Sequence, residues 1–167
     1  MITIADIQRK HIRGFHRVLD SVSREKKYLV WTEAPPLREV RRFVTEGILH
    51  GNPQIVALDS GRVVGWCDIT PHQRQTTWHC AALGMGVVKE YRHAGIGGRL
   101  IHAALSKAKA LGLQRIELEV FEENLPAIAL YKSVGFQIEG RKIDAVRISG
   151  RQISVLLMAL FLKDYAR

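Results

Sequence analysis

The sequence of 167 residues predicts an α+β domain with a mixed, mostly antiparallel β-sheet flanked by helices. Three observations predict this class. Short apolar runs typical of strands alternate with stretches that have helical spacing. Consecutive strand-like runs come before a regular alternation of strand and helix, which is the order of an α+β fold. At about 150 residues per domain, the length matches one domain, so we expect residues 1–167 to form a single domain.

The first part of the chain predicts one strand and two helices. Residues 2–5 have the pattern of a short strand, and Asp6 is a candidate N-cap for the helix after it. That helix carries apolar residues at helical spacing: Ile7, Ile12, Phe15, Leu19 and Val22. A second helix is expected after Pro35 and Pro36, with an apolar face formed by Leu37, Val40, Phe43 and Val44. The Gly51-Asn52-Pro53 sequence predicts a turn after it.

The middle of the chain predicts three strands and a long helix. The strands are expected at 54–59, 62–70 and 78–88, with a Ser60-Gly61 turn between the first two. Residues 95–112 predict the long helix. Its buried stripe is expected to contain Leu100, Ile101, Ala104, Leu105, Ala108 and Leu111.

The last part of the chain alternates strand and helix and ends in two strands. A strand is expected at 114–120, followed by a helix at 126–135 that ends at a C-cap glycine. The closing strands are expected at 136–141 and 152–161. The predicted order is therefore β-α-α-β-β-β-α-β-α-β-β.

The composition is that of an ordinary globular protein with an excess of positive charge. Apolar residues make up 47% and charged residues 25%, which argues against disorder. No apolar run approaches the ~20 residues of a membrane span, and the first residues lack a signal-peptide pattern; a cytoplasmic protein is expected. The formal net charge of +9 suits an anionic partner: nucleic acid, an anionic membrane or a nucleotide-like ligand.

The cysteines and histidines do not predict a metal site. Cys67 and Cys80 have no CxxC partner and lie in strand-like runs, so we expect buried, unreactive thiols. No histidine pair has HExxH spacing, as the positions of His11, His16, His72 and His79 show. We therefore expect no metal.

The segment 86–100 has the features of an anion-binding site. It leads from a strand, through a basic turn, into a helix that begins with glycines. The first turn of a helix presents free N–H groups and partial positive charge, and missing Cβ atoms let a ligand approach them. The alternative is a glycine-rich helix start that serves close packing. The segment lacks the P-loop, Rossmann and kinase signatures.

Within this segment, Arg92-x-x-Gly95-x-Gly97 resembles the [Q/R]xxGx[G/A] acyl-CoA signature of the GNAT superfamily of N-acetyltransferases. Residues 118–136 resemble that family's later strand, asparagine and "ALY…GF" helix. The resemblance covers 54–160 and implies a GNAT fold, an N-acetyltransferase domain over 1–167 and acetyl-CoA as co-substrate. The tail 136–160 resembles bacterial members that acetylate small amines or amino acids, so we expect transfer to the primary amine of such a compound.

The resemblance also implies the residues that bind acetyl-CoA. Val87 and Val88, at the end of the long strand, would offer backbone groups to the pantetheine arm, and Asn124 would hydrogen-bond it. The diphosphate would be bound by the N–H groups and positive charge of a consecutive set: Arg92, His93, Ala94, Gly95, Ile96, Gly97, Gly98 and Arg99.

Acyl transfer to an amine requires a proton donor for the leaving thiolate and a way to deprotonate the ammonium. The resemblance places Tyr131 near the thioester sulfur, where it is the expected acid. Some family members carry a glutamate where this chain has Ala81. Glu119 is the candidate base, because its spacing to Tyr131 resembles the branch that acetylates ribosomal-protein N-termini. The alternatives are a solvated Glu119, or His79 or Asp68 acting through a water.

Acceptor contacts are expected before residue 54, where the family varies most. Glu33 could pair with an ammonium and Trp31 could wall the pocket, although simple loop packing explains both.

The alternative functions are a protein N-terminal acetyltransferase, a non-catalytic CoA sensor and a basic nucleic-acid-binding module. The last is disfavoured because no nucleic-acid motif is present. We expect a small amine as partner, no nucleic acid or membrane, and a homodimer.

Overall fold

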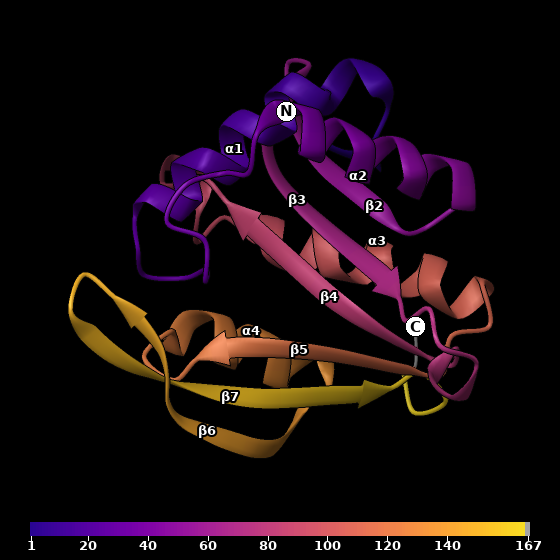
Figure 1. Ribbon diagram of the computed structural model, residues 1–167. Coiled ribbons are helices and arrows are strands. Elements are labelled where there is room, and N and C mark those ends of the chain that lie inside the picture. The colour runs from indigo at the N-terminus through magenta and orange to yellow at the C-terminus, as the bar shows by residue number, and fades with distance from the viewer. Residues whose placement is uncertain (166–167) are drawn as a thin grey trace.

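The computed structural model describes residues 1–165 and contains a seven-stranded sheet of strand order β1-β2-β3-β4-β5-β7-β6 (Figure 1). The strands are β1 (Ile2–Asp6), β2 (Gln54–Asp59), β3 (Arg62–Pro71), β4 (Cys80–Val87), β5 (Arg115–Phe121), β6 (Gln137–Ile148) and β7 (Arg151–Phe161). The helices are α1 (Ile12–Arg24), α2 (Leu37–His50), α3 (Ile96–Ala110) and α4 (Leu125–Val134). The predicted class and the predicted order of strands and α-helices are confirmed.

The helices cover both faces of the sheet (Figure 1). Phe15 of α1 packs against Phe43 of α2 and against the ring of Trp66 on β3, with ring centroids 6.4 and 5.6 Å apart. The next strand residue back, Gly65, faces Leu100 of α3 instead. Because neighbouring strand residues point to opposite faces, α1 and α2 lie on the Trp66 face and α3 lies on the other.

The sheet opens between β4 and β5, the one parallel pair among its strands in residues 1–165. These two strands pair only where Cys80–Ala82 faces Arg115–Glu117. Beyond that point β4 continues its pairing with β3 and β5 continues with β7, and the two strands diverge (Figure 1). A cleft can therefore form in the middle of the sheet without breaking either half of it.

Local sequence explains where the helices near this opening begin and end. Gly95 adopts φ +73°, a left-handed conformation that glycine reaches without strain, and α3 starts directly after it. The side-chain oxygen of Asn124 accepts a hydrogen bond from the Ala127 amide at 3.3 Å and caps α4. Gly135 closes α4 in the left-handed conformation, as the sequence predicts.

Two predictions for the helices were wrong. Asp6 does not cap α1, because it is the last residue of β1 and its carboxylate accepts a hydrogen bond from Lys107 of α3 at 2.8 Å. A 3-10 turn, Arg9–His11, precedes α1. Leu111 is 49% exposed and does not belong to the buried stripe, because α3 ends at Ala110.

Two strand boundaries also differ from the prediction. β4 begins at Cys80 because a 3-10 turn, Gln75–Thr77, occupies the segment before it. β6 extends to Ile148 through a register irregularity between Lys142 and Val146. The irregularity interrupts the alternation of apolar and polar residues from which a strand is predicted.

Other expectations concern burial, membranes and metals. Both cysteines are buried, as predicted. Among the helices formed by residues 1–165, none is long and apolar enough to cross a membrane. The same residues contain no cluster of three His, Cys, Asp or Glu side chains arranged to hold a metal ion.

Candidate functional site

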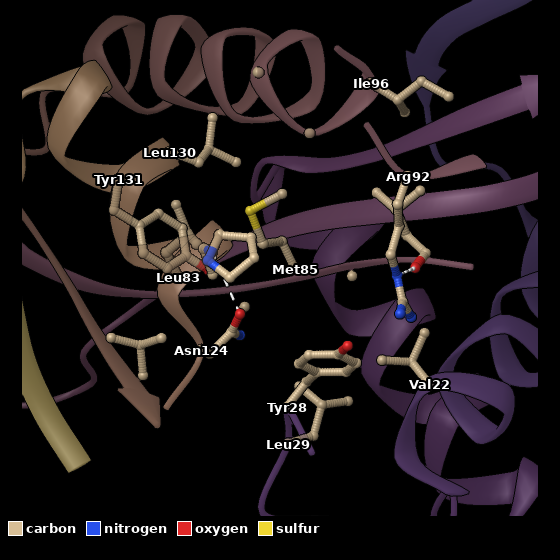
Figure 2. Close-up of a pocket in the computed structure, with 18 of the residues that line it drawn as sticks. Val22, Tyr28, Leu29, Leu83, Met85, Arg92, Ile96, Asn124, Leu130 and Tyr131 are labelled. Carbon is tan, nitrogen blue, oxygen red and sulfur yellow. Dashed lines mark hydrogen bonds between the residues drawn. The ribbon is translucent and has the colours of Figure 1, made fainter. Parts of the chain in front are cut away.

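A cleft of about 360 Å³ lies where β4 and β5 separate. Its walls come from the end of α1 and the loop after it, the second half of β4, the start of α3, β5, and α4. Figure 2 shows Tyr131, Leu130 and Leu83 at one end of the cleft and Arg92 and Ile96 at the other. The two ends differ in chemistry.

The amide end of the cleft is the first turn of α3. Its first intrahelical bond runs from the Arg99 amide to the Gly95 carbonyl at 3.2 Å, so the amides of residues 96–98 have no partner within the helix. No acidic side chain lies in this turn. A Cβ on Gly97 would lie 3.0 Å from a Leu130 methyl group, so this glycine also serves the packing of α3 on α4. Free amides and the helix dipole suit a diphosphate.

Arg92 lines the cleft, but its guanidinium is held by protein groups (Figure 2). Its Nε donates to the Val87 carbonyl at 2.8 Å and its Nη1 donates to Glu25 Oε2 at 2.9 Å. Its second terminal nitrogen donates to the other Glu25 oxygen. The guanidinium also lies over the Tyr28 ring, 4.7 Å from its centroid. Glu25 raises the pKa of Arg92 and keeps it charged.

The other residues expected to bind acetyl-CoA around the start of α3 divide into two groups. His93 lines the cleft, as do residues 95–98. Arg99 instead donates to the Ile2 carbonyl at 2.9 Å, and the Val88 amide donates to the Val64 carbonyl at 3.0 Å. Arg99, Val88 and Ala94 are not among the residues that form the cleft wall in the described chain.

The other end of the cleft is built around Tyr131 and Asn124. Tyr131 is 7% exposed, and its ring packs on Phe136 with centroids 5.8 Å apart. Burial raises the pKa of the Tyr131 phenol well above its usual value, so the hydroxyl stays protonated at neutral pH. The Asn124 side chain uses its oxygen to cap α4, which leaves its NH₂ donors for a ligand.

Two carboxylates lie on the sheet face that α1 and α2 cover: Glu119 lines the cleft, and Asp68 lies behind its wall, next to Gly84. Glu119 of β5 lines the cleft, is 52% exposed, and accepts a hydrogen bond from Lys142 Nζ of β6 at 2.5 Å. Asp68 of β3 pairs in register with Gly84 of β4, which is also a wall residue. Trp66 Nε1 donates to Asp68 Oδ2 at 3.1 Å, and burial raises the pKa of Asp68 to about 7.

The residues expected to contact the acceptor lie outside the cleft. Trp31 is 53% exposed, and Glu33 pairs with Arg24 at 3.3 Å. Their loop instead contributes Tyr28 and Leu29, just before them in the sequence, to the cleft wall. The predicted loop therefore reaches the site through Tyr28 and Leu29 and not through Trp31 and Glu33.

The family follows from comparison of the sequence with known families. The sequence model described as "Acetyltransferase (GNAT) family" matches residues 17–136. The chain belongs to the GNAT family. It is accordingly an N-acetyltransferase of GNAT type with acetyl-CoA as its co-substrate. The match covers the cleft from α1 to the end of α4.

Three relatives named as acetyltransferases are 28% to 35% identical to this chain over the residues that align. The L-amino acid N-acetyltransferase AaaT of Escherichia coli is 34% identical over 110 residues, 65% of this chain and 68% of its own. The N-alpha-acetyltransferase RimI of Mycobacterium tuberculosis is 35% identical over 59% of this chain and 61% of its own. An L-methionine sulfoximine/L-methionine sulfone acetyltransferase of Pseudomonas aeruginosa is 28% identical over 78% of each chain.

Solved structures confirm the GNAT fold. A GNAT-family acetyltransferase from Streptococcus pneumoniae superposes with a TM-score of 0.89 at 26% identity, covering 96% of this chain and 99% of that one. The yncA protein of Salmonella typhimurium, solved with its cofactor acetyl-CoA, gives 0.91 at 16% identity and covers 99% and 96%. The free amides of α3 and the glycines beside them fit an anionic ligand of this kind.

Proposed function

We propose that this GNAT enzyme transfers the acetyl group of acetyl-CoA to the primary amine of a small molecule, with a free α-amino acid as the first candidate. One observation carries the proposal. A single cleft joins the free amides of α3 at one end to Tyr131 and Glu119 at the other. This arrangement provides an anion site, a proton donor and a contact for an ammonium ion. The names of the E. coli and P. aeruginosa relatives support an amino-acid acceptor.

The proposal assigns acetyl-CoA binding to the described walls of the cleft. The amides of residues 96–98 would hold the diphosphate, with His93 beside them. The NH₂ group of Asn124 and the backbone of Val87 would contact the pantetheine arm. Acetyl-CoA supplies an acetyl group already activated as a thioester. Arg92 would act indirectly, by holding the loop before α3 against Glu25.

Tyr131 is the proposed acid. It reaches the cleft from α4, and its raised pKa keeps a proton available across the neutral range. A phenol delivers that proton to the leaving sulfur without placing a fixed positive charge in a buried wall. Tyr131 would then recover a proton from solvent before the next turnover.

The Glu119–Lys142 pair supports a zwitterionic acceptor. Glu119 lines the cleft, and its ion pair brings the Lys142 ammonium next to that wall residue. Both side chains are about half exposed. An α-amino acid carries the complementary pair of charges: its ammonium suits Glu119 and its carboxylate suits Lys142. Val22, Tyr28 and Leu29 add an apolar wall for the acceptor side chain.

The second candidate acceptor is a peptide N-terminus, which the RimI relative's name favours. A peptide has an amide where an amino acid has its α-carboxylate, so it leaves Lys142 without a partner from the acceptor.

The proposed homodimer, the cytoplasmic location and the expectation of no nucleic-acid or membrane partner stay predictions. Light scattering of the purified protein tests the dimer.

An acceptor screen tests the function. We expect acetyl-CoA to raise Tm and CoA to be released with free amino acids at least tenfold faster than with their amides or short peptides. Faster release with peptides would favour the N-terminal acetyltransferase instead. A raised Tm without CoA release from any acceptor would overturn the proposed reaction and indicate a sensor.

A further inference from the structure

We propose that Asp68, rather than Glu119, is the base that takes the proton from the acceptor amine. The inference rests on the proposed N-acetyltransferase function and adds a catalytic residue from β3 to it. Five observations on residues 1–165 carry it. They are the sheet face that Asp68 shares with Glu119, the missing side chain at Gly84, the hydrogen bond from Trp66, the apolar surroundings of the Asp68 carboxyl group, and the ion pair that Glu119 already forms.

Asp68 and Glu119 lie on the same face of the sheet, on opposite sides of its opening. Asp68 pairs with Gly84 across β3 and β4, so both point to one face. Ala82 pairs with Glu117 across β4 and β5. Because the side-chain period of a strand is two, Gly84 and Glu119 then share that face as well. This is the face that α1 and α2 cover, and it carries the loop residues Tyr28 and Leu29 at the cleft.

The glycine opposite Asp68 leaves the carboxyl group next to the cleft wall. A Cβ built on Gly84 would lie 3.4 Å from Asp68 Oδ2 and 3.6 Å from Oδ1, so both oxygens lie beside the backbone of this wall residue. Gly86 lies two residues after Gly84 on β4, next to the Trp66 ring. A Cβ built on Gly86 would lie 2.4 Å from that ring. β4 therefore has no side chain at Gly84 to separate Asp68 from the cleft.

The hydrogen bond from Trp66 orients the carboxyl group and leaves one oxygen for a substrate. The indole donates to Oδ2, and within residues 1–165 Oδ1 accepts no hydrogen bond. Asp68 is part-buried and its oxygens lie beside the wall residue Gly84, so in the proposed reaction an acceptor amine, or one water, reaches Oδ1 past this glycine. An oriented carboxyl group with one free oxygen is what proton transfer requires.

The surroundings of Asp68 are apolar and match its titration to neutral pH. On the side away from the cleft it borders a cavity of about 10 Å³ whose other lining includes Ile7, Phe15, Phe43 and Ile55. The polar side chains beside it on this face are the Trp66 indole and the Gln54 amide. The lining that the structure describes contains no other charged side chain. Desolvation therefore raises the pKa of Asp68 to about 7.

Glu119 is placed for a different task. Its carboxylate is held by Lys142 at 2.5 Å and is half exposed to water. A carboxylate in this position can bind a cation, but one of its oxygens is already bound to the Lys142 ammonium. The two carboxylates therefore have different roles in the proposal: Glu119 binds the acceptor's ammonium group, and Asp68 takes a proton from it.

The proton balance closes with Tyr131. The acceptor enters as an ammonium ion, and Asp68 takes the proton that frees the nitrogen lone pair. The nitrogen then bonds to the acetyl carbonyl carbon as the carbon–sulfur bond breaks. The nitrogen releases its second proton to water, Tyr131 gives its phenolic proton to the sulfur, and Tyr131 then recovers a proton from water. Overall one of the two nitrogen protons is balanced by the proton on the CoA thiol, and the other passes from Asp68 to solvent.

The pH–rate profiles of matched amide variants, Asp68→Asn and Glu119→Gln, test the assignment. We expect kcat/KM of the unmutated enzyme to fall as pH drops below about 7. Asp68→Asn should lower kcat by about 10²–10⁴-fold and abolish this dependence, while the Tm shift with acetyl-CoA is kept. Glu119→Gln should raise KM and keep the dependence. If Asp68→Asn keeps kcat within threefold, or Glu119→Gln alone removes the dependence, Asp68 is not the base.

A measurement without acetyl-CoA checks the position of the carboxyl group. The Asp68 carboxyl titrates at about pH 7 in the folded protein and near pH 4 when unfolded. The folded state therefore binds the extra proton between these values, and its stability falls as pH rises through them. The Tm of Asp68→Asn minus the Tm of the unmutated protein should therefore increase from pH 4 to pH 7. A constant difference would overturn the proposal even if Asp68→Asn is inactive.

Discussion

The guanidinium of Arg92 is bound to the carboxylate of Glu25, 67 residues earlier in the sequence. This pair ties the loop before α3 to the end of α1, and Tyr28 stacks on the same guanidinium. Arg92 of the acyl-CoA motif thus holds the loop that leads to the free amides of α3. Its charge is already neutralised by Glu25, so its effect on acetyl-CoA binding should depend on Glu25.

Glu25→Gln tests this dependence. Both side chains are about four-fifths buried, and losing a hydrogen bond between charged groups costs about 1.5–3 kcal/mol. We expect a lower Tm and weaker acetyl-CoA binding, although the variant removes an anion near an anionic ligand. Isothermal titration with acetyl-CoA measures the affinity. Tighter binding by Glu25→Gln would show instead that freed Arg92 contacts the phosphates directly.

Gly97 is expected to serve both packing and ligand approach. In Gly97→Ala the new methyl group would lie 3.0 Å from Leu130 and beside the free amides of α3. We expect a lower Tm and about tenfold weaker acetyl-CoA binding, which is about 1.4 kcal/mol. The double variant Gly97→Ala/Leu130→Ala separates the two effects, because it removes the clash. Recovery of affinity in the double variant would assign Gly97 to packing alone.

The sequence predicted what depends on short-range pattern. The order of elements follows from apolar spacing and turn residues, and the start of α3 follows from the glycines beginning at Gly95. The end of β4 was predicted to within one residue, and the glycine that closes α4 was predicted, because local residues determine both. Glu119 does line the cleft, in agreement with the spacing that suggested it.

Long-range contacts were not predictable in the same way. The Arg92–Glu25 pair joins two segments that no local pattern relates. The place of Asp68 depends on the register that sets it opposite Gly84, and the cleft itself depends on β4 and β5 parting after Ala82. Tyr28 could have been selected from its position beside Leu29, as an aromatic–apolar pair in a polar loop.

Tyr131→Phe tests the proposed acid. The substitution removes the phenolic proton and keeps the ring that packs on Phe136. We expect kcat to fall by about 10²–10⁴-fold with little change in the Tm shift produced by acetyl-CoA. Because the pKa of Tyr131 is raised by burial, the unmutated enzyme should keep its activity up to pH 9. Full turnover by Tyr131→Phe would exclude the acid role.

Lys142→Gln tests recognition of the acceptor carboxylate. If Lys142 binds that group, the variant should lose the preference for a free amino acid over its amide, mainly through a higher KM. The matched control is Arg151→Gln, which breaks a similarly exposed pair with Glu123. Glu119, the partner of Lys142, lines the cleft, whereas Glu123 is not among the wall residues that the structure describes. Steady-state kinetics with an amino acid and its amide measure the ratio. An unchanged ratio in Lys142→Gln, or an equal loss in Arg151→Gln, would mean that the Glu119–Lys142 pair does not select the acceptor.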